Sequence, residues 1–412
     1  MSNAIVMPAK QGFYEKVVLR MLSKMKLGTL HLTLPSGIQV TLGNGEGGII
    51  ANAEIRNQEF FKRCVLYGDI GFGEAYVDGD WDTDNITNVI KWFLLNVENA
   101  PTVSGSSAQS FVLNILKVFN KIYHLKRENS ISGSKKNIQE HYDLNNDFFA
   151  SFLDPTMTYS SAYFYKDGIS LQEAQVAKYD RLCRQMSLKR GDHVLEIGSG
   201  WGGNAIHIAK NYGCYVTSVT ISEEQCKLAK ERVEKEGLSD RVNIILQDYR
   251  YLEGQFDKIV SIEMLEAVGA NFYDAYFKKC HELLKKDGIL AIQVITCPDS
   301  RFENLRAGVD WIQKHIFPGS LLPSVAAINR AINNTGDLTL VDLKDMGTDY
   351  AKTLELWRVG FNKKLNEVKQ LGFDDRFIRK WNYYLSYCEG AFAMRNINVM
   401  QMVYARPNNT NR

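Results

Sequence analysis

A glycine-rich loop is the feature of this sequence that says most about chemistry. It reads Glu196-Ile-Gly-Ser-Gly-Trp-Gly-Gly203 and directly follows the apolar run 193–197. Gly198 and Gly200 allow a tight turn and the close approach of a ligand, and the amino terminus of a following helix favours electronegative groups. Between a strand and a helix, such a loop indicates a cofactor site more than a simple turn.

Two cofactors have to be compared, because Gly198, Gly200 and Gly203 also satisfy the G-x-G-x-x-G dinucleotide pattern. A nicotinamide site expects an acidic residue about twenty positions further on, where it binds the ribose. Here the second expected strand ends in Thr220-Ile-Ser222, and the first acidic residues follow inside the helix that Ser222 should cap. The dinucleotide pattern is therefore incomplete.

S-adenosylmethionine suits the sequence better. This methyl donor presents a sulfonium and an amino-acid carboxylate, with no pyrophosphate to cradle. Glu196, two residues before the first glycine, suits the donor's ammonium group. Gln247-Asp248-Tyr249, at the end of the third expected strand, can hydrogen-bond and cover the adenine. These residues predict a methyl-donor site.

A parallel sheet is needed to bring these residues together. From about residue 170 strands and helices alternate, which is typical of a doubly wound α/β fold. Ligands in such folds lie beyond the carboxyl ends of the strands. We expect strands at 193–197, 216–220, 242–246, 256–261 and 288–294, and helices at 205–212, 222–236 and 272–286.

Three parts of the chain are distinguished by composition. Residues 1–100 are expected to form a small mixed domain that guides lipid or mediates homodimerisation, because short alternating runs lie there among many glycines. Residues 101–136 are expected to be a linker with a helix at 111–125, and residues 137–412 the catalytic domain. The basic amphipathic segments 13–26 and 111–125 either lie on an anionic membrane surface or pack their apolar stripes on the protein.

Charge, cysteines and hydropathy exclude several classes of protein. The formal net charge of +2 gives no strong field for nucleic acid. Seven scattered cysteines without a Cys-x-x-Cys pair are typical of a reducing cytoplasm, and they indicate neither a disulfide framework nor a metal site. No signal peptide or membrane-spanning apolar run is present in the sequence. We expect a cytoplasmic protein that contacts the inner face of the membrane peripherally.

Beyond the glycine loop, the sequence resembles the cyclopropane fatty acid synthases and the related mycolic acid methyltransferases. The resemblance runs from about Asn137 to Arg406 and is weaker through 68–81. The matching motifs follow one another in the family's order: Glu140-His-Tyr-Asp-Leu144, Asp154-Pro-Thr-Met-Thr-Tyr-Ser160, Leu195-Glu-Ile-Gly-Ser-Gly-Trp-Gly202, Val219-Thr-Ile-Ser222, Leu246-Gln-Asp-Tyr-Arg250, Glu263-Met-Leu-Glu-Ala-Val-Gly269, Ile316-Phe-Pro-Gly319, Leu322-Pro-Ser324 and Gly390-Ala-Phe392.

This resemblance implies a Rossmann-like class I methyltransferase fold with a parallel-rich seven-stranded sheet. It also implies a reaction, in which S-adenosylmethionine alkylates the cis double bond of an unsaturated phospholipid acyl chain and leaves S-adenosylhomocysteine. Such a reaction needs the methyl carbon aligned at near-attack distance, and it forms a carbocation that must be kept from water. Loss of a proton from the transferred methyl then closes a cyclopropane ring. In this family a bicarbonate ion is the expected base.

Roles for individual residues follow from the same resemblance. The residues expected to bind the cofactor are Tyr159, Ser160, Glu196, Gly198, Gly200, Gly202, Thr220, Ser222, Gln225, Gln247, Asp248 and Tyr249. Those expected around bicarbonate are Glu266, Tyr350, Gln293 and the backbone amides of Ser161 and Ile295. His141 is expected either to order the segment near residue 159 or to cap local structure. Glu266 has two other interpretations, as the base itself or as an ordinary acid at a helix start.

Some positions depart from the family pattern and leave alternatives open. Ser161 replaces a cysteine, Gln293 replaces a histidine that ligates bicarbonate, and Ala267 stands where many members carry histidine. Glutamine still donates a hydrogen bond but has no titratable proton. The alternatives are a methyl-branched acyl product, a soluble unsaturated acceptor, and a non-catalytic protein that binds S-adenosylmethionine or lipid.

Segment 302–350 interrupts the alternation of strands and helices. We expect it either to wall an acyl tunnel or to pack in the core. The side chains concerned are Trp311, Ile316, Phe317 and Leu321.

Overall fold

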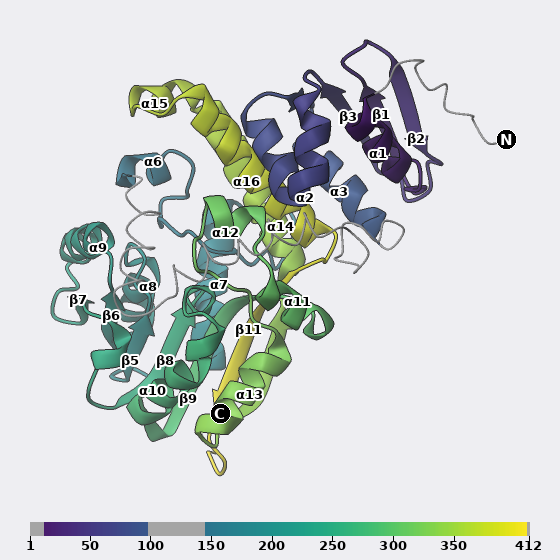
Figure 1. Ribbon diagram of the computed structural model, residues 1–412. Helices are drawn as coiled ribbons and strands as arrows, with labels where there is room; N and C mark the ends of the chain where they lie inside the picture. Colours follow the sequence, from purple (N-terminus) through teal and green to yellow (C-terminus); the bar gives the residue numbers. More distant parts are fainter. Residues whose placement is uncertain (1–11, 98–144, 410–412) are drawn as a thin grey trace.

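A seven-stranded sheet dominates the computed structural model of the protein, which describes residues 12–97 and 145–409 (Figure 1). Its strands lie in the order β10-β11-β9-β8-β5-β6-β7. From β9 to β7 the neighbouring strands are parallel, whereas β11 is antiparallel to both β9 and β10. The strands are β5 His193–Ile197, β6 Tyr215–Thr220, β7 Val242–Leu246, β8 Phe256–Ile262, β9 Leu284–Thr296, β10 Thr339–Asp345 and β11 Asn398–Ala405. The predicted parallel-rich sheet is confirmed.

All five strands predicted for this sheet form close to their expected positions. The central strands β5, β8 and β9 are almost continuously buried, as strands covered on both faces should be. One predicted helix was too long. Helix α10 ends at Leu283 rather than near residue 286, because Leu284 already pairs with Phe256 of the neighbouring strand.

Helices flank the sheet and fill the connections between its strands (Figure 1). Several begin at a residue whose side chain caps the first turn; Ser170, for example, forms a capping box with Glu173. The helices of residues 145–409 are α6 Asn146–Ala150, α7 Leu171–Gln185, α8 Gly203–Tyr212, α9 Glu223–Lys235, α10 Tyr273–Leu283, α11 Phe302–Ala307, α12 Trp311–His315, α13 Val325–Thr335, α14 Gly347–Lys363, α15 Leu365–Gln370 and α16 Asp375–Ala393.

A smaller mixed sheet lies in the amino-terminal part, as predicted. Its strands have the order β2-β1-β3-β4, with β1 antiparallel to β2 and parallel to β3. Within residues 12–97 three helices accompany it, and the first of them buries its apolar residues Val18, Leu19 and Leu22 against the protein. The elements are α1 Phe13–Leu22, β1 Thr29–Thr33, β2 Gln39–Gly43, β3 Ile50–Ile55, α2 Glu59–Val77, β4 Trp81–Asp82 and α3 Ile86–Leu95. For segment 13–22, packing is therefore the interpretation that the structure supports.

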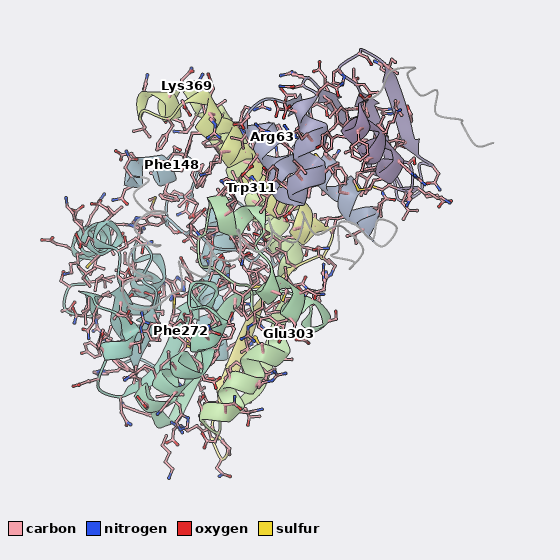
Figure 2. All side chains as sticks on the ribbon, viewed as in Figure 1. Arg63, Phe148, Phe272, Glu303, Trp311 and Lys369 are labelled. Atoms are coloured by element: carbon pink, nitrogen blue, oxygen red, sulfur yellow. The ribbon has the colours of Figure 1, made fainter. Side chains whose placement is uncertain are left out.

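Helix α16 holds the amino-terminal part against the rest of the chain, because it packs on α2, α3 and α14 (Figure 1). Trp311 of α12, labelled in Figure 2, lies 4.6 Å from the ring of Tyr383 and is 1% exposed. A Cβ at Gly73 of α2 would come within 2.5 Å of this indole. Glycine at position 73 thus permits the close contact between the two parts.

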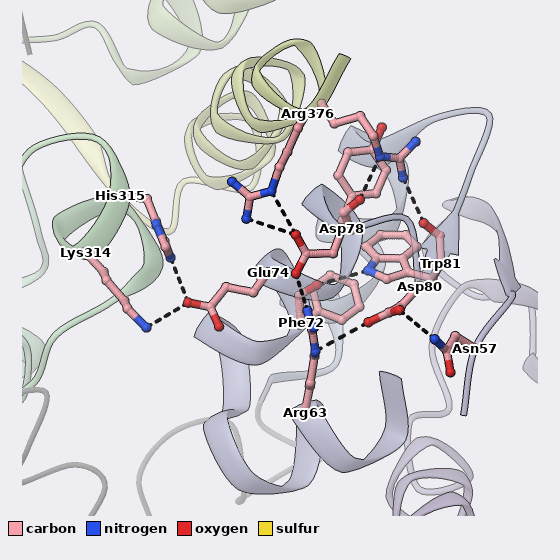
Figure 3. A network of polar contacts seen from close by, with 12 residues as sticks. Asn57, Arg63, Phe72, Glu74, Asp78, Asp80, Trp81, Lys314, His315 and Arg376 are labelled. Atoms are coloured by element: carbon pink, nitrogen blue, oxygen red, sulfur yellow. Dashed lines mark hydrogen bonds and ion pairs between the residues drawn. The ribbon is translucent and has the colours of Figure 1, made fainter. Parts of the chain in front are cut away.

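Ion pairs reinforce this contact (Figure 3). The Glu74 carboxylate accepts hydrogen bonds from Lys314 Nζ at 2.7 Å and from the His315 ring at 2.9 Å. The carboxylate of Asp78, the residue directly after α2, joins Arg63 of that helix to Arg376 of α16. Pairs between segments this distant in sequence fix the orientation of α2 relative to α12 and α16.

Several sequence predictions lie outside the described residues, namely the linker 101–136 with its helix at 111–125, and His141. Among the helices of residues 12–97 and 145–409, none is long and apolar enough to cross a membrane.

Candidate active site

A cavity of about 420 Å³ lies at the carboxyl ends of the parallel strands and collects most of the predicted site residues. Ser161, Gln293, Gly202 and Ser222 are not part of its lining, although each contacts or adjoins residues that are. The predicted residues that line it are Tyr159, Ser160, Glu196, Gly198, Gly200, Thr220, Gln225, Gln247, Asp248, Tyr249, Glu266, Ile295 and Tyr350.

The glycine loop turns sharply at the carboxyl end of β5. Gly198, Gly200 and Gly202 have φ values of +97°, +48° and +83°, a region that strongly favours glycine. At Gly203 an added Cβ would lie 2.8 Å from the carbonyl oxygen of Thr156. The loop is therefore shaped to let segment 156–160 pass directly over the start of α8.

Glu196 lies below this loop and is 2% exposed. One carboxylate oxygen accepts a hydrogen bond from Asn204 Nδ2 at 2.8 Å, and the other accepts one from Ser218 Oγ. Burial raises the pKa of Glu196 to about 7, although these two hydrogen bonds oppose the rise. The carboxyl group thus ties β5 to β6 and α8 while one side of the residue faces the cavity.

The far end of the donor-binding region is built by β6 and β7. Ser222 caps α9 through the backbone amide of Gln225, and the Gln225 side chain accepts a hydrogen bond from Thr220 Oγ1 at 3.0 Å. Asp248 receives two hydrogen bonds from the Arg250 guanidinium, at 2.9 and 2.6 Å. Polar groups at these strand ends are held in place before any ligand arrives.

Tyr159 covers the cavity from the other side. Its hydroxyl lies 2.8 Å from that of Tyr384, and its ring packs at 5.1 Å from Phe149 and 5.3 Å from Trp357. The adjacent Ser160 accepts a hydrogen bond at 2.7 Å from Lys178 Nζ. The segment expected to fold over the donor is therefore anchored on both faces.

Lys178 is a charged residue with no exposed surface, which sequence reasoning missed. Burial lowers its pKa to about 7, while the carboxylates of Glu263, Asp154 and Glu196 act to raise it. A buried ammonium needs compensating charge. Its position predicts that at least one of these acids is ionised.

Glu263 is the acid best supplied with hydrogen-bond donors. Its Oε1 atom accepts hydrogen bonds from the Ser161 backbone amide at 2.9 Å and from Gln293 Nε2 at 2.8 Å. The Tyr350 hydroxyl is a third partner of this carboxylate. Burial raises the pKa of Glu263, and the Lys178 charge is the largest influence opposing that rise.

Glu266, three residues later, has fewer donors. Its Oε1 atom accepts a hydrogen bond from the Ile295 amide at 2.5 Å, and its buried Oε2 atom has no partner. Burial, followed by the charge of Glu263, raises the pKa of Glu266 to about 8. At neutral pH we therefore assign the negative charge to Glu263 and a proton to Glu266.

Apolar side chains also line the same cavity. Of the four side chains predicted to wall a tunnel, Phe317 and Leu321 line the cavity. Trp311 and Ile316 belong instead to the core, 1% and 4% exposed. The other apolar residues of the lining include Leu305, Ile312, Leu322, Leu354, Phe392 and Ile397.

Comparison with known proteins places this site in a family. A family described as mycolic acid cyclopropane synthetase matches residues 129–402. The chain belongs to this family. The tuberculostearic acid methyltransferase UfaA1 of Mycobacterium tuberculosis is 40% identical over 84% of this chain and 81% of its own. The cyclopropane-fatty-acyl-phospholipid synthase of Escherichia coli is 39% identical over 87% of this chain and 89% of its own.

Solved structures of the family share the fold. The cyclopropane synthase MmaA2 from Mycobacterium tuberculosis has 28% identity and a TM-score of 0.61, covering 66% of this chain and 98% of that chain. The mycolic acid cyclopropane synthase CmaA1 complexed with SAH and CTAB has 31% identity and the same TM-score, covering 66% of this chain and 98% of that chain. The predicted class I methyltransferase fold is confirmed, and the family supports S-adenosylmethionine as the cofactor.

The bicarbonate expected for this family does not fit the site. The Ser161 amide, Gln293 and Tyr350 already donate to the Glu263 carboxylate, and the Ile295 amide donates to Glu266. These are the donors that were expected to hold the ion. A bicarbonate beside the Glu263 carboxylate would also bring two negative charges together, so no step is derived through it.

Two of the residues at this site, Glu263 and Lys178, were not predicted. A signal for Lys178 existed, because it lies four residues from both Ala174 and Leu182 on the apolar face of α7. For Glu263 the sequence offered only an acid inside a family motif. Its role depends on contacts with segments 102 and 30 residues away.

Proposed function

We propose that the protein transfers the methyl group of S-adenosylmethionine to the cis double bond of an unsaturated phospholipid acyl chain, forming a cyclopropane fatty acid. The observation that carries this proposal is the continuity of a single cavity. Its lining includes the glycine loop, the polar ends of β6 and β7, the acids Glu263 and Glu266, and a set of apolar side chains. A polar cofactor and an acyl chain can therefore meet inside one enclosure.

The reaction requires alignment of the reacting carbons and exclusion of water more than chemical activation of the alkene. Methyl transfer from a sulfonium to an alkene needs no prior deprotonation, but the two carbons must be aligned at near-attack distance. The resulting carbocation survives only where water is excluded and electron-rich groups surround it. The rings of Tyr159, Tyr350, Tyr384 and Phe392 line the cavity and supply such faces.

The donor-binding roles follow the polar lining. We assign the methionine part of the donor to the loop 196–202, the ribose to Thr220 and Gln225, and the adenine to Gln247, Asp248 and Tyr249. Tyr159 and Ser160 cover the donor, and Ser222 positions Gln225. The apolar part of the lining, which includes Phe317 and Leu321, then receives the acyl chain.

Access to phospholipid implies contact with a membrane surface. We propose that the protein binds the inner face of the membrane peripherally, with residues 1–100 guiding lipid or mediating homodimerisation. Vesicle co-sedimentation tests the first part of this proposal, since an enzyme acting on a soluble acceptor should remain in the supernatant.

The function is tested with purified protein, S-adenosylmethionine and vesicles of monounsaturated phospholipid, followed by mass spectrometry of the fatty acid methyl esters. We expect a gain of one CH2 on the unsaturated chains, and none with saturated vesicles or without the donor. Absence of that gain with folded, donor-binding protein would refute acyl-chain alkylation.

A methyl-branched or methylene product is the second candidate, favoured by the similarity to a tuberculostearic acid methyltransferase at 40% identity. Both products arise from the same methylated cation. A hydride shift before loss of the proton gives the methylene product, and a methyl branch further requires reduction by a separate hydride donor, whereas direct loss from the methyl closes the ring. Chromatography against standards distinguishes the two in the same experiment.

A further inference from the structure

We propose that Glu263 is the proton acceptor of this reaction and takes the place that bicarbonate was expected to fill. This inference rests on the proposed function, because it assigns a base to the same alkylation. Its basis is the convergence of three hydrogen-bond donors from distant segments on one carboxylate that lines the cavity.

The donor chain behind Glu263 is directional. Arg181 can only donate, and its Nη1 atom bonds Gln401 Oε1 at 2.7 Å. Gln401 must then turn its amide nitrogen to Gln293 Oε1, at 2.9 Å, which in turn directs Gln293 Nε2 to Glu263. The orientation of both amides is thus fixed by the guanidinium. Gln293 Nε2 also donates to the Ser161 carbonyl oxygen at 3.2 Å, but its shorter bond, at 2.8 Å, goes to Glu263, whose carboxylate is the stronger acceptor.

The backbone at Glu263 is held in an unusual conformation. Its φ is +48°, in the left-handed region that residues other than glycine rarely adopt. Its amide donates to the carbonyl oxygen of Gln293 at 2.7 Å, which fastens the turn after β8 to β9. Strained residues that the surroundings hold in place are concentrated at functional sites. Here the conformation directs the carboxylate toward Ser161 and Tyr350.

The buried charge of Lys178 also acts on Glu263. Lys178 has no exposed surface, and the carboxylates that influence its pKa are those of Glu263, Asp154 and Glu196. Its ammonium favours an ionised carboxylate at Glu263, as a base must be. Glu266 has one backbone donor and a free Oε2 atom, so it is the neutral partner of the pair.

The step balances without a further reactant. The sulfur–methyl bond breaks with its electron pair remaining on sulfur, and the alkene π electrons form the new carbon–carbon bond. Glu263 then removes a proton from the transferred methyl, and the C–H electron pair closes the ring onto the cationic carbon. Glu263 ends as a neutral carboxylic acid and returns its proton to water when the product leaves.

The experiment compares Glu263→Gly with Glu263→Gln. Glycine removes the carboxylate, frees the donors and relaxes the left-handed backbone, so this variant should fold. Glutamine keeps the volume of the side chain but cannot serve as the base. We expect both variants to lose activity by about 100-fold or more, the usual contribution of general base catalysis. Added bicarbonate or formate should partly restore the glycine variant and leave the glutamine variant inactive.

Wild-type protein should be equally active in carbon dioxide-free buffer and in added bicarbonate. A wild-type rate that requires bicarbonate, or a Glu263→Gln variant of normal rate, would overturn the inference while leaving the proposed function intact. Binding of 13C-labelled bicarbonate, followed by NMR, gives a readout independent of turnover. Glu263→Gly should bind the ion and wild type should not. Binding of bicarbonate by wild type but not by Glu263→Gly would refute the assignment of Glu263 as the base, even if the methyl acceptor were a molecule other than phospholipid.

Discussion

Replacing Glu266 with glutamine should stabilise the protein, and increasingly so as the pH rises. Burial, reinforced by the charge of Glu263, raises the pKa of Glu266 from the ordinary 4.5 to about 8. Between these two values the folded protein holds a proton that the unfolded chain releases. The contribution of this carboxyl to stability is therefore fully present below pH 4.5 and is lost progressively up to about pH 8. Glutamine does not titrate, and so the variant avoids this loss.

The magnitude follows from the slope of that loss. One proton held only by the folded state costs about 1.4 kcal/mol of stability for each pH unit. From about pH 5.5 to about pH 7.5 the advantage of Glu266→Gln over wild type should grow by up to about 2.7 kcal/mol. With an unfolding entropy of about 2.1 cal/mol/K per residue, 412 residues give about 0.9 kcal/mol/K, so the advantage corresponds to about 3 °C in Tm.

Calorimetry of both proteins across this pH range measures the effect. The matched control is Glu253→Gln, which changes an exposed glutamate in the same way and should follow wild type at every pH. A difference in Tm between Glu266→Gln and wild type that stays constant across the range would show that Glu266 is already ionised in the folded protein. The assignment of the charge to Glu263 and the proton to Glu266 would then be wrong.

Three further predictions test other contacts. Burial acts to raise the pKa of Glu74, but hydrogen bonds from His315 and Lys314 hold this pKa at about 2, below the ordinary 4.5. Glu74→Gln should therefore lower Tm at neutral pH. The loss in Tm should become smaller as the pH falls from 4.5 towards 2, because wild-type Glu74 is then protonated as well. Gly73→Ala should destabilise the protein by about 1–3 kcal/mol in thermal or denaturant unfolding, because its Cβ would collide with Trp311, and an unchanged Tm would contradict that contact. Asp248→Ala should weaken binding of S-adenosylhomocysteine about tenfold in calorimetric titration, since Arg250 loses the ion pair that orders this strand end; unchanged affinity would remove Asp248 from the adenine site.

Local patterns in the sequence were sufficient to predict the sheet. Apolar runs marked β5 to β9, and the glycines at 198 and 200 marked the turn at which the cavity opens. These predictions succeeded because strand burial and glycine conformations depend mainly on neighbouring residues. The end of α10 was misplaced for the opposite reason, since the pairing of Leu284 with Phe256 decides it and that pairing joins separate segments.

The contacts around the acids could not be predicted in this way. Ser161 was expected to use its backbone amide, and that amide is indeed a donor, but its acceptor is Glu263. The amide orientation of Gln293 depends on Gln401 and Arg181, which come from β11 and α7. No spacing of residues along the chain predicts such a hydrogen-bond network, because its members come into contact only when the sheet and its helices have formed.

The two glutamates of one short motif show how the fold assigns chemistry to identical side chains. Glu263 and Glu266 are three residues apart, and burial acts to raise the pKa of both. The difference lies in what the rest of the chain brings to each. Glu263 receives three donors and lies near a buried ammonium, whereas Glu266 receives one backbone amide. Because two adjacent carboxylates cannot both keep their charge at low cost, these contacts decide which one ionises and which one holds the proton.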